Sequence, residues 1–274
     1  MQRRRCVASI DPVYEPVPKQ PERDAPWEGK YPAPDPNPEV ARLLKESKDA
    51  AARGDQRESE RKLQEATRAM DRWSKQEVKR LHRSGVAASK QGGPRVPKEV
   101  PDILHIGREA ALLGIETGAM EYAGDVLFGY NKVRLRQLKE TGMPIARQAQ
   151  PEPPLEFSEA IYLDKQVQLL LSEPGSSGGF ELAQELFAAW GEARLAKLES
   201  EAEESIRAGI TMVPRQISEA IKIAQEIAVL GGPFEESLKA RADQTLQSIA
   251  EQWLAQRAET LGARGVAEAS QAGE

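Results

Sequence analysis

Two apolar helical stretches on either side of one short break constrain the fold of this chain more than any other feature. They lie within Ile103–Leu138 and are separated at Thr117-Gly118. The pattern predicts one helix over Asp102–Glu116, ended by Gly118, and a second over Ala119–Lys139. Because so few residues connect them, we expect the two helices to pack together as an antiparallel αα-hairpin.

Glycines are unusually frequent in this predicted hairpin. Gly107, Gly114, Gly124 and Gly129 all lie in it. Each glycine inside a helix costs about 1 kcal/mol of helix stability relative to alanine. Glycines kept at that cost indicate a close approach of two backbones. The hairpin is therefore predicted to be the most tightly packed part of the chain.

The rest of the sequence is also helical in character. Apolar residues recur at helical spacing, period-two runs of β-branched residues are missing, and aromatic residues make up only 5% of the chain. The predicted fold class is all-α, with four antiparallel αα-hairpins stacked either as a short solenoid or as two helical bundles, and preceded by an extended Pro-rich arm. The other helices are expected over 39–83 with a break at Gly54-Asp55, 157–172, 180–207, 215–230 and 234–261.

Charge and proline content divide the chain into five predicted regions. Residues 1–150 hold 28 Lys or Arg and 22 Asp or Glu, whereas residues 151–274 hold 10 and 21. The net charge is therefore +6 in the first part and −11 in the second. The expected regions are a Pro-rich arm over 1–38, a basic helical region over 39–147, a Pro-rich linker over 148–156, an acidic helical region over 157–262 and a flexible tail over 263–274.

The arm is rich in proline, with nine prolines between residues 11 and 38. Proline restricts its own backbone and that of the preceding residue to extended conformations, which excludes a helix or a central strand. Tyr14, Trp27 and Tyr31 are the candidate anchors to a protein partner. One hypothesis places the arm on the surface of this chain or a neighbour; the alternative is a disordered tail.

Short sequence signals also bear on the cellular compartment. Residues 1–10 contain three arginines and no acid, as organellar transit peptides do, and the alternative is an ordinary solvated terminus. No apolar run is long enough to span a membrane. The only cysteine, Cys6, excludes a disulfide within the chain. We expect a soluble intracellular protein, either organellar or cytoplasmic.

The segment Arg72–Lys98 concentrates positive charge. It holds eight Lys or Arg and one acid, Glu77. One interpretation is a site for RNA, DNA or another polyanion, because such clusters neutralise phosphates. The alternative is a solvated helix end followed by a mobile loop. The candidate polyanion-binding residues are Arg72, Lys75, Lys79, Arg80, Arg83 and Lys90.

A short motif recurs at the predicted turns. Gly118-Ala-Met-Glu-Tyr-Ala matches Gly178-Gly-Phe-Glu-Leu-Ala and Gly232-Pro-Phe-Glu-Glu-Ser, and Gly54-Asp-Gln-Arg-Glu-Ser is a degenerate copy. The motif resembles the Gly-Asp-apolar-Glu-x-Ala turn between the two helices of tetratricopeptide repeats. Those repeats recur at 34 residues, whereas these turns lie 64, 60 and 54 residues apart. The resemblance implies tetratricopeptide-like hairpins that stack into a surface for protein partners.

Residues that carry chemistry are scarce. His82 and His105 are the only histidines, and neither has a second ligand at metal-binding spacing. The glycine pairs lack the Lys-Ser or Lys-Thr of a phosphate-binding loop. We expect no catalytic, metal or cofactor site, and a non-enzymatic scaffold, adaptor or assembly subunit that binds protein partners. The alternatives are the polyanion-binding module and an enzyme whose site the sequence hides. The oligomeric state stays open.

Overall fold

The computed structural model describes residues 33–171 and 178–272, with side chains described as far as residue 265. These residues form eight α-helices and no strand, which confirms the predicted all-α class. The helices are α1 (Pro38–Ala52), α2 (Gln56–Ser89), α3 (Glu99–Leu112), α4 (Ala119–Ala146), α5 (Leu155–Leu171), α6 (Gly179–Arg207), α7 (Arg215–Leu230) and α8 (Glu235–Ala272).

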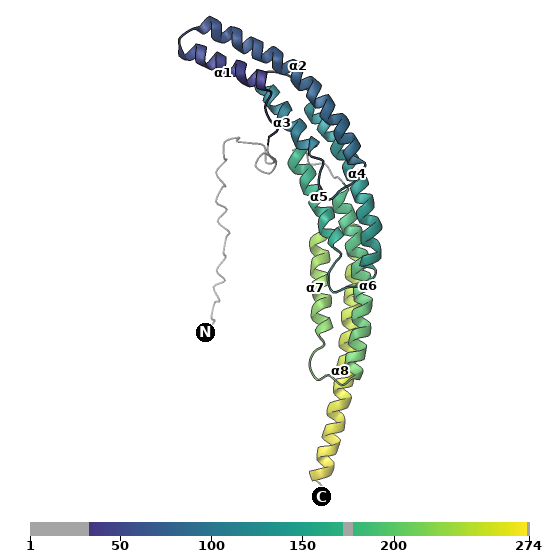
Figure 1. The fold of residues 1–274 in the computed structure, drawn as a ribbon. Helices are drawn as coiled ribbons and strands as arrows, with labels where there is room; N and C mark the ends of the chain where they lie inside the picture. Colours follow the sequence, from purple (N-terminus) through teal and green to yellow (C-terminus); the bar gives the residue numbers. More distant parts are fainter. Residues whose placement is uncertain (1–32, 172–177, 273–274) are drawn as a thin grey trace, which may run out of the picture.

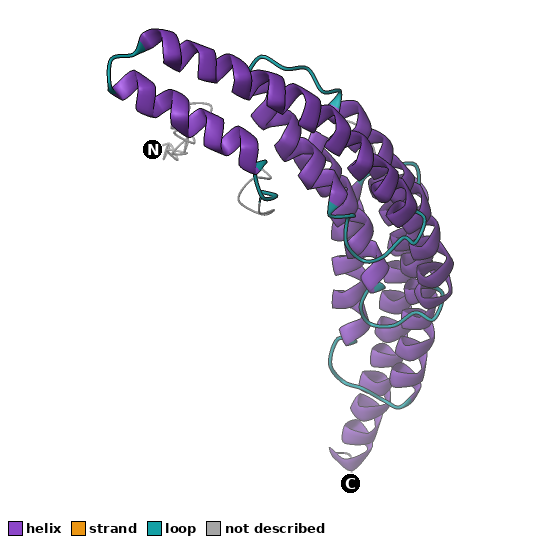
Figure 2. Cartoon of the chain, turned by 45° about the horizontal axis from the view of Figure 1, so that its top comes forward, coloured by secondary structure: helices purple, strands orange, loops and turns teal. Residues whose placement is uncertain are grey.

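The helices form four hairpins, because each odd-numbered helix packs against the even-numbered helix that follows it. The hairpins are stacked through their even-numbered helices: α2 contacts α4, α4 contacts α6, and α6 contacts α8. The result is one elongated, curved array, shown from two directions in Figures 1 and 2. The even-numbered helices lie on its convex side, and α1, α3, α5 and α7 lie on its concave side (Figure 1).

Three hydrophobic clusters fill the array from end to end. The first joins α1 and α2 to the end of α3, the second extends from α2 to α6, and the third joins α6, α7 and α8. On α4, Leu138 belongs to the second cluster and Ala146 to the third. The packed interior is therefore continuous past the predicted linker over 148–156. Trp190 of α6 also donates a hydrogen bond to the backbone oxygen of Gln150 in that segment (2.8 Å).

Left-handed glycines stand at all four hairpin turns, with φ between +67° and +96° at the four motif positions. The role predicted for Gly118 is corrected by the structure. Gly114, also left-handed, follows the end of α3, whereas Gly118 is the residue directly before α4. Gly178 holds the same place before α6. The motif glycine thus precedes the second helix in these two turns, and only Gly54, which follows the capping residue Arg53, lies just after the end of a first helix as expected.

The prediction of close backbone approach is right for two of the four glycines in this hairpin. A Cβ on Gly107 would lie closer than 3.0 Å to the Cβ of Ala119, and a Cβ on Gly129 would lie 3.1 Å from the Ser89 hydroxyl. No atom lies within 4 Å of a Cβ built on Gly124 or Gly114. Gly114 is explained by its left-handed backbone instead, and the structure offers no reason for Gly124.

Three helices run further than their patterns predicted. α2 continues to Ser89 because Gly85 packs against Val126 of α4, where a Cβ would lie 2.9 Å from two methyl groups. α4 continues through Gly142 and Pro144 to Ala146. A proline in a helix removes one backbone donor, and packing of Ala146 into the third cluster supports this last turn. α8 reaches Ala272, beyond the expected end near Leu261.

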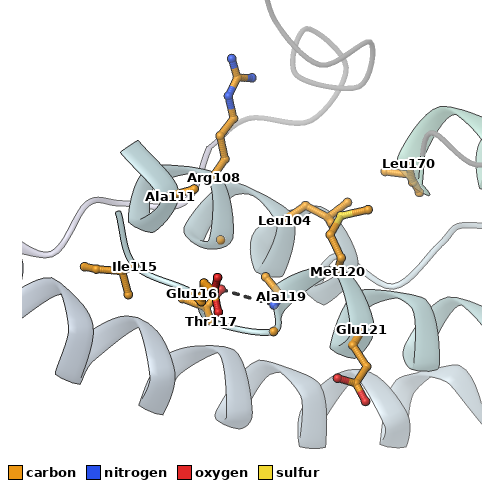
Figure 3. Close-up of a pocket in the computed structure, with 12 residues that line it drawn as sticks. Leu104, Arg108, Ala111, Ile115, Glu116, Thr117, Ala119, Met120, Glu121 and Leu170 are labelled. Atoms are coloured by element: carbon orange, nitrogen blue, oxygen red, sulfur yellow. Dashed lines mark hydrogen bonds between the residues drawn. The ribbon is translucent and has the colours of Figure 1, made fainter. Parts of the chain in front are cut away.

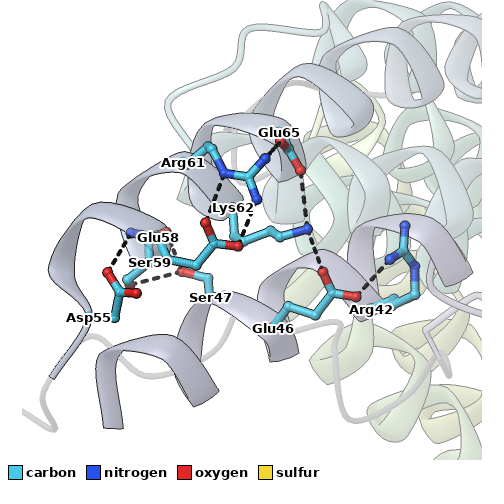
Figure 4. Close-up of polar contacts among 9 residues, drawn as sticks. All are labelled: Arg42, Glu46, Ser47, Asp55, Glu58, Ser59, Arg61, Lys62 and Glu65. Atoms are coloured by element: carbon cyan, nitrogen blue, oxygen red, sulfur yellow. Dashed lines mark hydrogen bonds and ion pairs between the residues drawn. The ribbon is translucent and has the colours of Figure 1, made fainter. Parts of the chain in front are cut away.

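The first hairpin carries an ion-pair network on its surface (Figure 4). Lys62 of α2 pairs with Glu46 of α1 at 2.8 Å, and Arg61 pairs with Glu58 at 2.7 Å. Ser47 donates a hydrogen bond across the hairpin to the backbone oxygen of Ser59 (2.9 Å). End repeats of stacked arrays need a polar outer surface. The network gives the hairpin at this end of the array that polar character.

None of the helices in the described part of the chain has the length and apolar character of a membrane span.

Candidate functional site

Two apolar hollows open on the concave side of the array, one at each end of α5. They exist because the odd-numbered helices pack on the even-numbered ones and make few or no contacts with each other. We call them the α3–α5 hollow and the α5–α7 hollow. They are the candidate functional site, since concave apolar surfaces are where proteins most often bind ligands and peptides.

The α3–α5 hollow has a volume of about 640 Å³, and the turn between α3 and α4 forms part of its lining (Figure 3). Leu104 and Ala111 of α3, Met120 of α4 and Leu170 of α5 supply its apolar lining. The Thr117 hydroxyl accepts a hydrogen bond from the backbone N–H of Ala119 (3.3 Å), which fixes the turn at the edge of the hollow. Its charged residues are Arg108, Glu116 and Glu121.

The α5–α7 hollow has a volume of about 700 Å³. Leu155 and Phe157 at the start of α5 face Val229 and Leu230 at the end of α7, with the buried Phe187 of α6 also in the lining. Leu155 and Val229 are each 86% exposed. Two large apolar side chains on opposite walls of one hollow, both left in water, are typical of a docking surface.

The two hollows are held at a fixed separation by α5. Leu155 lines one hollow and Leu170 lines the other, 15 residues apart on one helix, which corresponds to ~22 Å at ~1.5 Å per residue. Tyr162, which is 56% exposed, lies between them on α5. Because α5 packs on both α4 and α6, the continuous core sets this geometry before any partner binds.

All six predicted polyanion-binding residues are exposed on α2 or just beyond it. Five of them share one face of α2, and that face also carries Arg68, which lies before the basic segment Arg72–Lys98. Spacings of three, four and seven residues would have included it. Arg80 lies on another face and pairs with Glu77 at 2.5 Å, which holds the pKa of that carboxyl below its usual range. The α2 cation stripe consists of Arg68, Arg72, Lys75, Lys79, Arg83 and Lys90.

A third hollow, of about 790 Å³, adjoins the stripe. It lies between α2 and the turn at residues 114–116, and Arg68, Arg72 and Lys75 line it. Two acids share it: Asp71, which pairs with Lys75 at 2.6 Å, and Glu116. The stripe therefore borders a recess with more cations than acids.

Two charged residues, Asp164 and Arg194, are buried in the second half of the array. Arg194 of α6 is 4% exposed and pairs with Glu219 of α7 at 2.6 Å and with Glu201 at 3.1 Å. It also donates to the backbone oxygen of Ala149 (3.5 Å). The hydrogen bond that Arg194 donates to the Glu219 carboxylate raises the pKa of Arg194 above its usual range. A guanidinium with three partners on three segments joins α6, α7 and the chain before α5, which is a structural role.

The two histidines also lie among the packed helices. His82 Nε2 lies 2.7 Å from Asp125 Oδ2 of α4, and its ring lies 4.8 Å from that of Tyr122. His105 is buried in α3. Over the described residues, no three His, Cys, Asp or Glu side chains gather as metal ligands would. Tyr14, Trp27, Tyr31 and Cys6 lie outside the described residues.

No protein-family model, curated protein or solved structure matches this chain. The resemblance to tetratricopeptide repeats therefore rests on the four turn motifs alone and stays a prediction.

Proposed function

We propose that this protein is a non-enzymatic helical scaffold, an assembly subunit that holds a segment of a protein partner along the concave side of its array. The observation that carries the proposal is the pair of apolar hollows at the two ends of α5, with Leu155 and Val229 exposed in one of them.

The partner segment is defined by the spacing of the hollows. A partner that fills both must place apolar side chains ~22 Å apart, which an extended peptide of ~7 residues or a helix of ~15 residues achieves. Full burial of one Leu or Val contributes about 1.5–3 kcal/mol. Leu155, Val229, Tyr162 and Met120 together contribute roughly 6–12 kcal/mol of gross binding energy. A micromolar complex needs about 8 kcal/mol net of the cost of association, so contacts to the rest of the lining must supply the remainder.

The Pro-rich arm adds a second contact in this proposal. Tyr14, Trp27 and Tyr31 are aromatic residues in a segment whose prolines reduce the entropy lost on binding. We propose that the arm contacts the same complex, in the cytoplasm or in an organelle. This part of the proposal rests on sequence, and it is tested separately from the hollows by deleting residues 1–32.

The test is capture of partners from an extract of the source cells, with four forms of the tagged chain. These are the unmodified chain, Leu155→Glu with Val229→Glu, Phe128→Glu, and the chain without residues 1–32. Phe128 is the matched control because it is 73% exposed on α4 and lines neither hollow. A carboxylate in an apolar hollow prevents docking, since burying it unpaired is costly.

We expect one or more proteins to be retained by the unmodified chain and by Phe128→Glu, and to be lost from the double variant. Each captured protein is then purified and its affinity measured against the same forms. Equal affinity for the double variant and the Phe128→Glu control would contradict the proposal. Loss on deletion of residues 1–32 alone, with no effect of the double variant, would move the binding site from the hollows to the arm.

A further inference from the structure

We infer that the α2 cation stripe binds the phosphate backbone of double-stranded nucleic acid, without reading its sequence. This site is separate from the concave hollows, and neither the scaffold proposal nor its test depends on it.

The stripe is straight and evenly charged. At 100° per residue, its six cations fall within ~80° of the circumference of α2. From Arg68 to Lys90 it spans 22 residues, or ~33 Å, which is close to the ~34 Å of one duplex turn. α2 is a single uninterrupted helix from Gln56 to Ser89 that packs on α1, α3 and α4, so a rigid support holds the row of charges in place.

Few acids neutralise the stripe. Lys75 pairs with Asp71, but no carboxylate of the described residues lies within ion-pair distance of the other five cations. On the remainder of the array, by contrast, exposed cations commonly pair with acids one helical turn away, as Arg42 does with Glu46 and Arg207 with Glu203. Five exposed and unpaired cations in one row attract a polyanion at a distance of several ångströms and release its counterions on contact.

The form of the site favours a duplex over a single strand. Proteins that bind single strands supply aromatic side chains on which the bases stack. The stripe has none: the nearest aromatic residue on α2, Trp73, is half-buried and packs on the two N-terminal hydrophobic clusters. Arg and Lys can read guanine from within the major groove, but α1, α3 and α4 pack against α2 and keep it from entering a groove as a free recognition helix does. Contacts to phosphates alone follow from this.

A second copy of this chain is the competing occupant, because residues 151–274 carry a net charge of −11. Its acids are distributed over α5 to α8 and many already hold cations, such as Glu219 and Glu201 on Arg194 and Glu199 on Arg241. A duplex offers an unbroken row of charges that matches the length of the stripe. We therefore commit to the duplex, and self-association becomes an outcome of the test.

The experiment measures binding of the full chain to a labelled 24-base-pair duplex, as DNA and as RNA, from 50 to 200 mM salt. Five cations predict a slope of log K against log salt of about −4.5, at about −0.9 per phosphate neutralised, and a loss of affinity of roughly 500-fold over this range. Arg72→Gln with Lys79→Gln leaves three cations and a slope of about −2.7. The control, Lys197→Gln with Arg264→Gln, removes the same charge from exposed positions on α6 and α8.

We expect the stripe variant to bind the duplex more weakly with the shallower slope, and the control to bind as the unmodified chain does. A single strand of equal length should bind more weakly than the duplex at every salt concentration. The inference is overturned if binding is independent of salt, if the control loses as much affinity as the stripe variant, or if the single strand or poly-glutamate binds as tightly as the duplex. A salt-sensitive dimer that the stripe variant abolishes would assign the stripe to a second copy instead.

Discussion

Replacing Gly107 by alanine tests the closest helix approach in the array. Gly107 lies on α3 where α4 begins, and a new Cβ would fall closer than 3.0 Å to the Cβ of Ala119, with the Ala119 Cα at 3.8 Å. Both neighbouring atoms belong to the short, rigid start of a helix, so the two helices must separate by at least several tenths of an ångström. Overpacking of this kind costs about 1–3 kcal/mol. The better helix propensity of alanine offsets up to about 1 kcal/mol of it.

Gly124 provides the matched control. It lies on α4 of the same hairpin, and no atom lies within 4 Å of the Cβ that alanine would add. Gly124→Ala should therefore raise the free energy of unfolding by about 0.5–1 kcal/mol, because only the helix-propensity term acts. The two Gly→Ala variants are expected to differ by about 1–3 kcal/mol, with Gly107→Ala the less stable.

Urea unfolding followed by circular dichroism measures both variants, and an unchanged m-value shows that the same unit unfolds. Gly107→Ala combined with Ala119→Gly removes the clash, so a coupling energy of about 1–3 kcal/mol is expected from the double-mutant cycle. If Gly107→Ala is as stable as Gly124→Ala, or if the cycle shows no coupling, the inferred approach of α3 and α4 is wrong.

Two further predictions concern buried charge. Arg194→Met should lower the free energy of unfolding by about 2–3 kcal/mol, because it leaves Glu219 and Glu201 without their shared partner. The control, Arg207→Met, removes an exposed ion pair and should change the free energy of unfolding by less than about 0.5 kcal/mol. Equal effects of the two variants in urea unfolding would contradict the structural role of Arg194. Burial raises the pKa of the Asp102 carboxyl above its ordinary value of 3.8. The folded chain therefore holds this proton more tightly than the unfolded chain does, and the free energy of unfolding falls as the pH rises from 3.8 through the raised pKa. Asp102→Asn should therefore gain stability relative to the unmodified chain between pH 4 and pH 7, and a difference in unfolding free energy that does not vary with pH would contradict this.

Most of the architecture followed from local signals. Helical spacing predicts all eight helices, and the start of α1 follows from a local preference: Asn37 caps it and accepts hydrogen bonds from the N–H groups of Glu39 and Val40. Local sequence does not predict a helix end correctly where contacts with a helix distant in the sequence stabilise the last turn. Pro144 predicts an end to α4, but the core contact of Ala146 is made with α6, which no local pattern contains.

The candidate site was only partly predictable. Charge counting identified the basic part of α2, and helical spacing alone would have separated Arg80 from the stripe and added Arg68. The hollows were not predictable from sequence. They depend on α5 standing apart from α3 and α7, and Leu155 and Val229 look like ordinary core residues in a helical pattern until their exposure is known. Local sequence reports which residues are apolar, but tertiary packing decides which of them remain uncovered.

The most direct measurement of the scaffold proposal is hydrogen–deuterium exchange of the chain with and without its captured partner. We predict slower exchange on binding in peptides that cover residues 152–162 and 222–230, and around the turn at 114–121, with α4 between Phe128 and Leu138 unchanged. Protection confined to the convex helices, or absent from both hollows in a saturated complex, would contradict the claim that the concave side holds the partner.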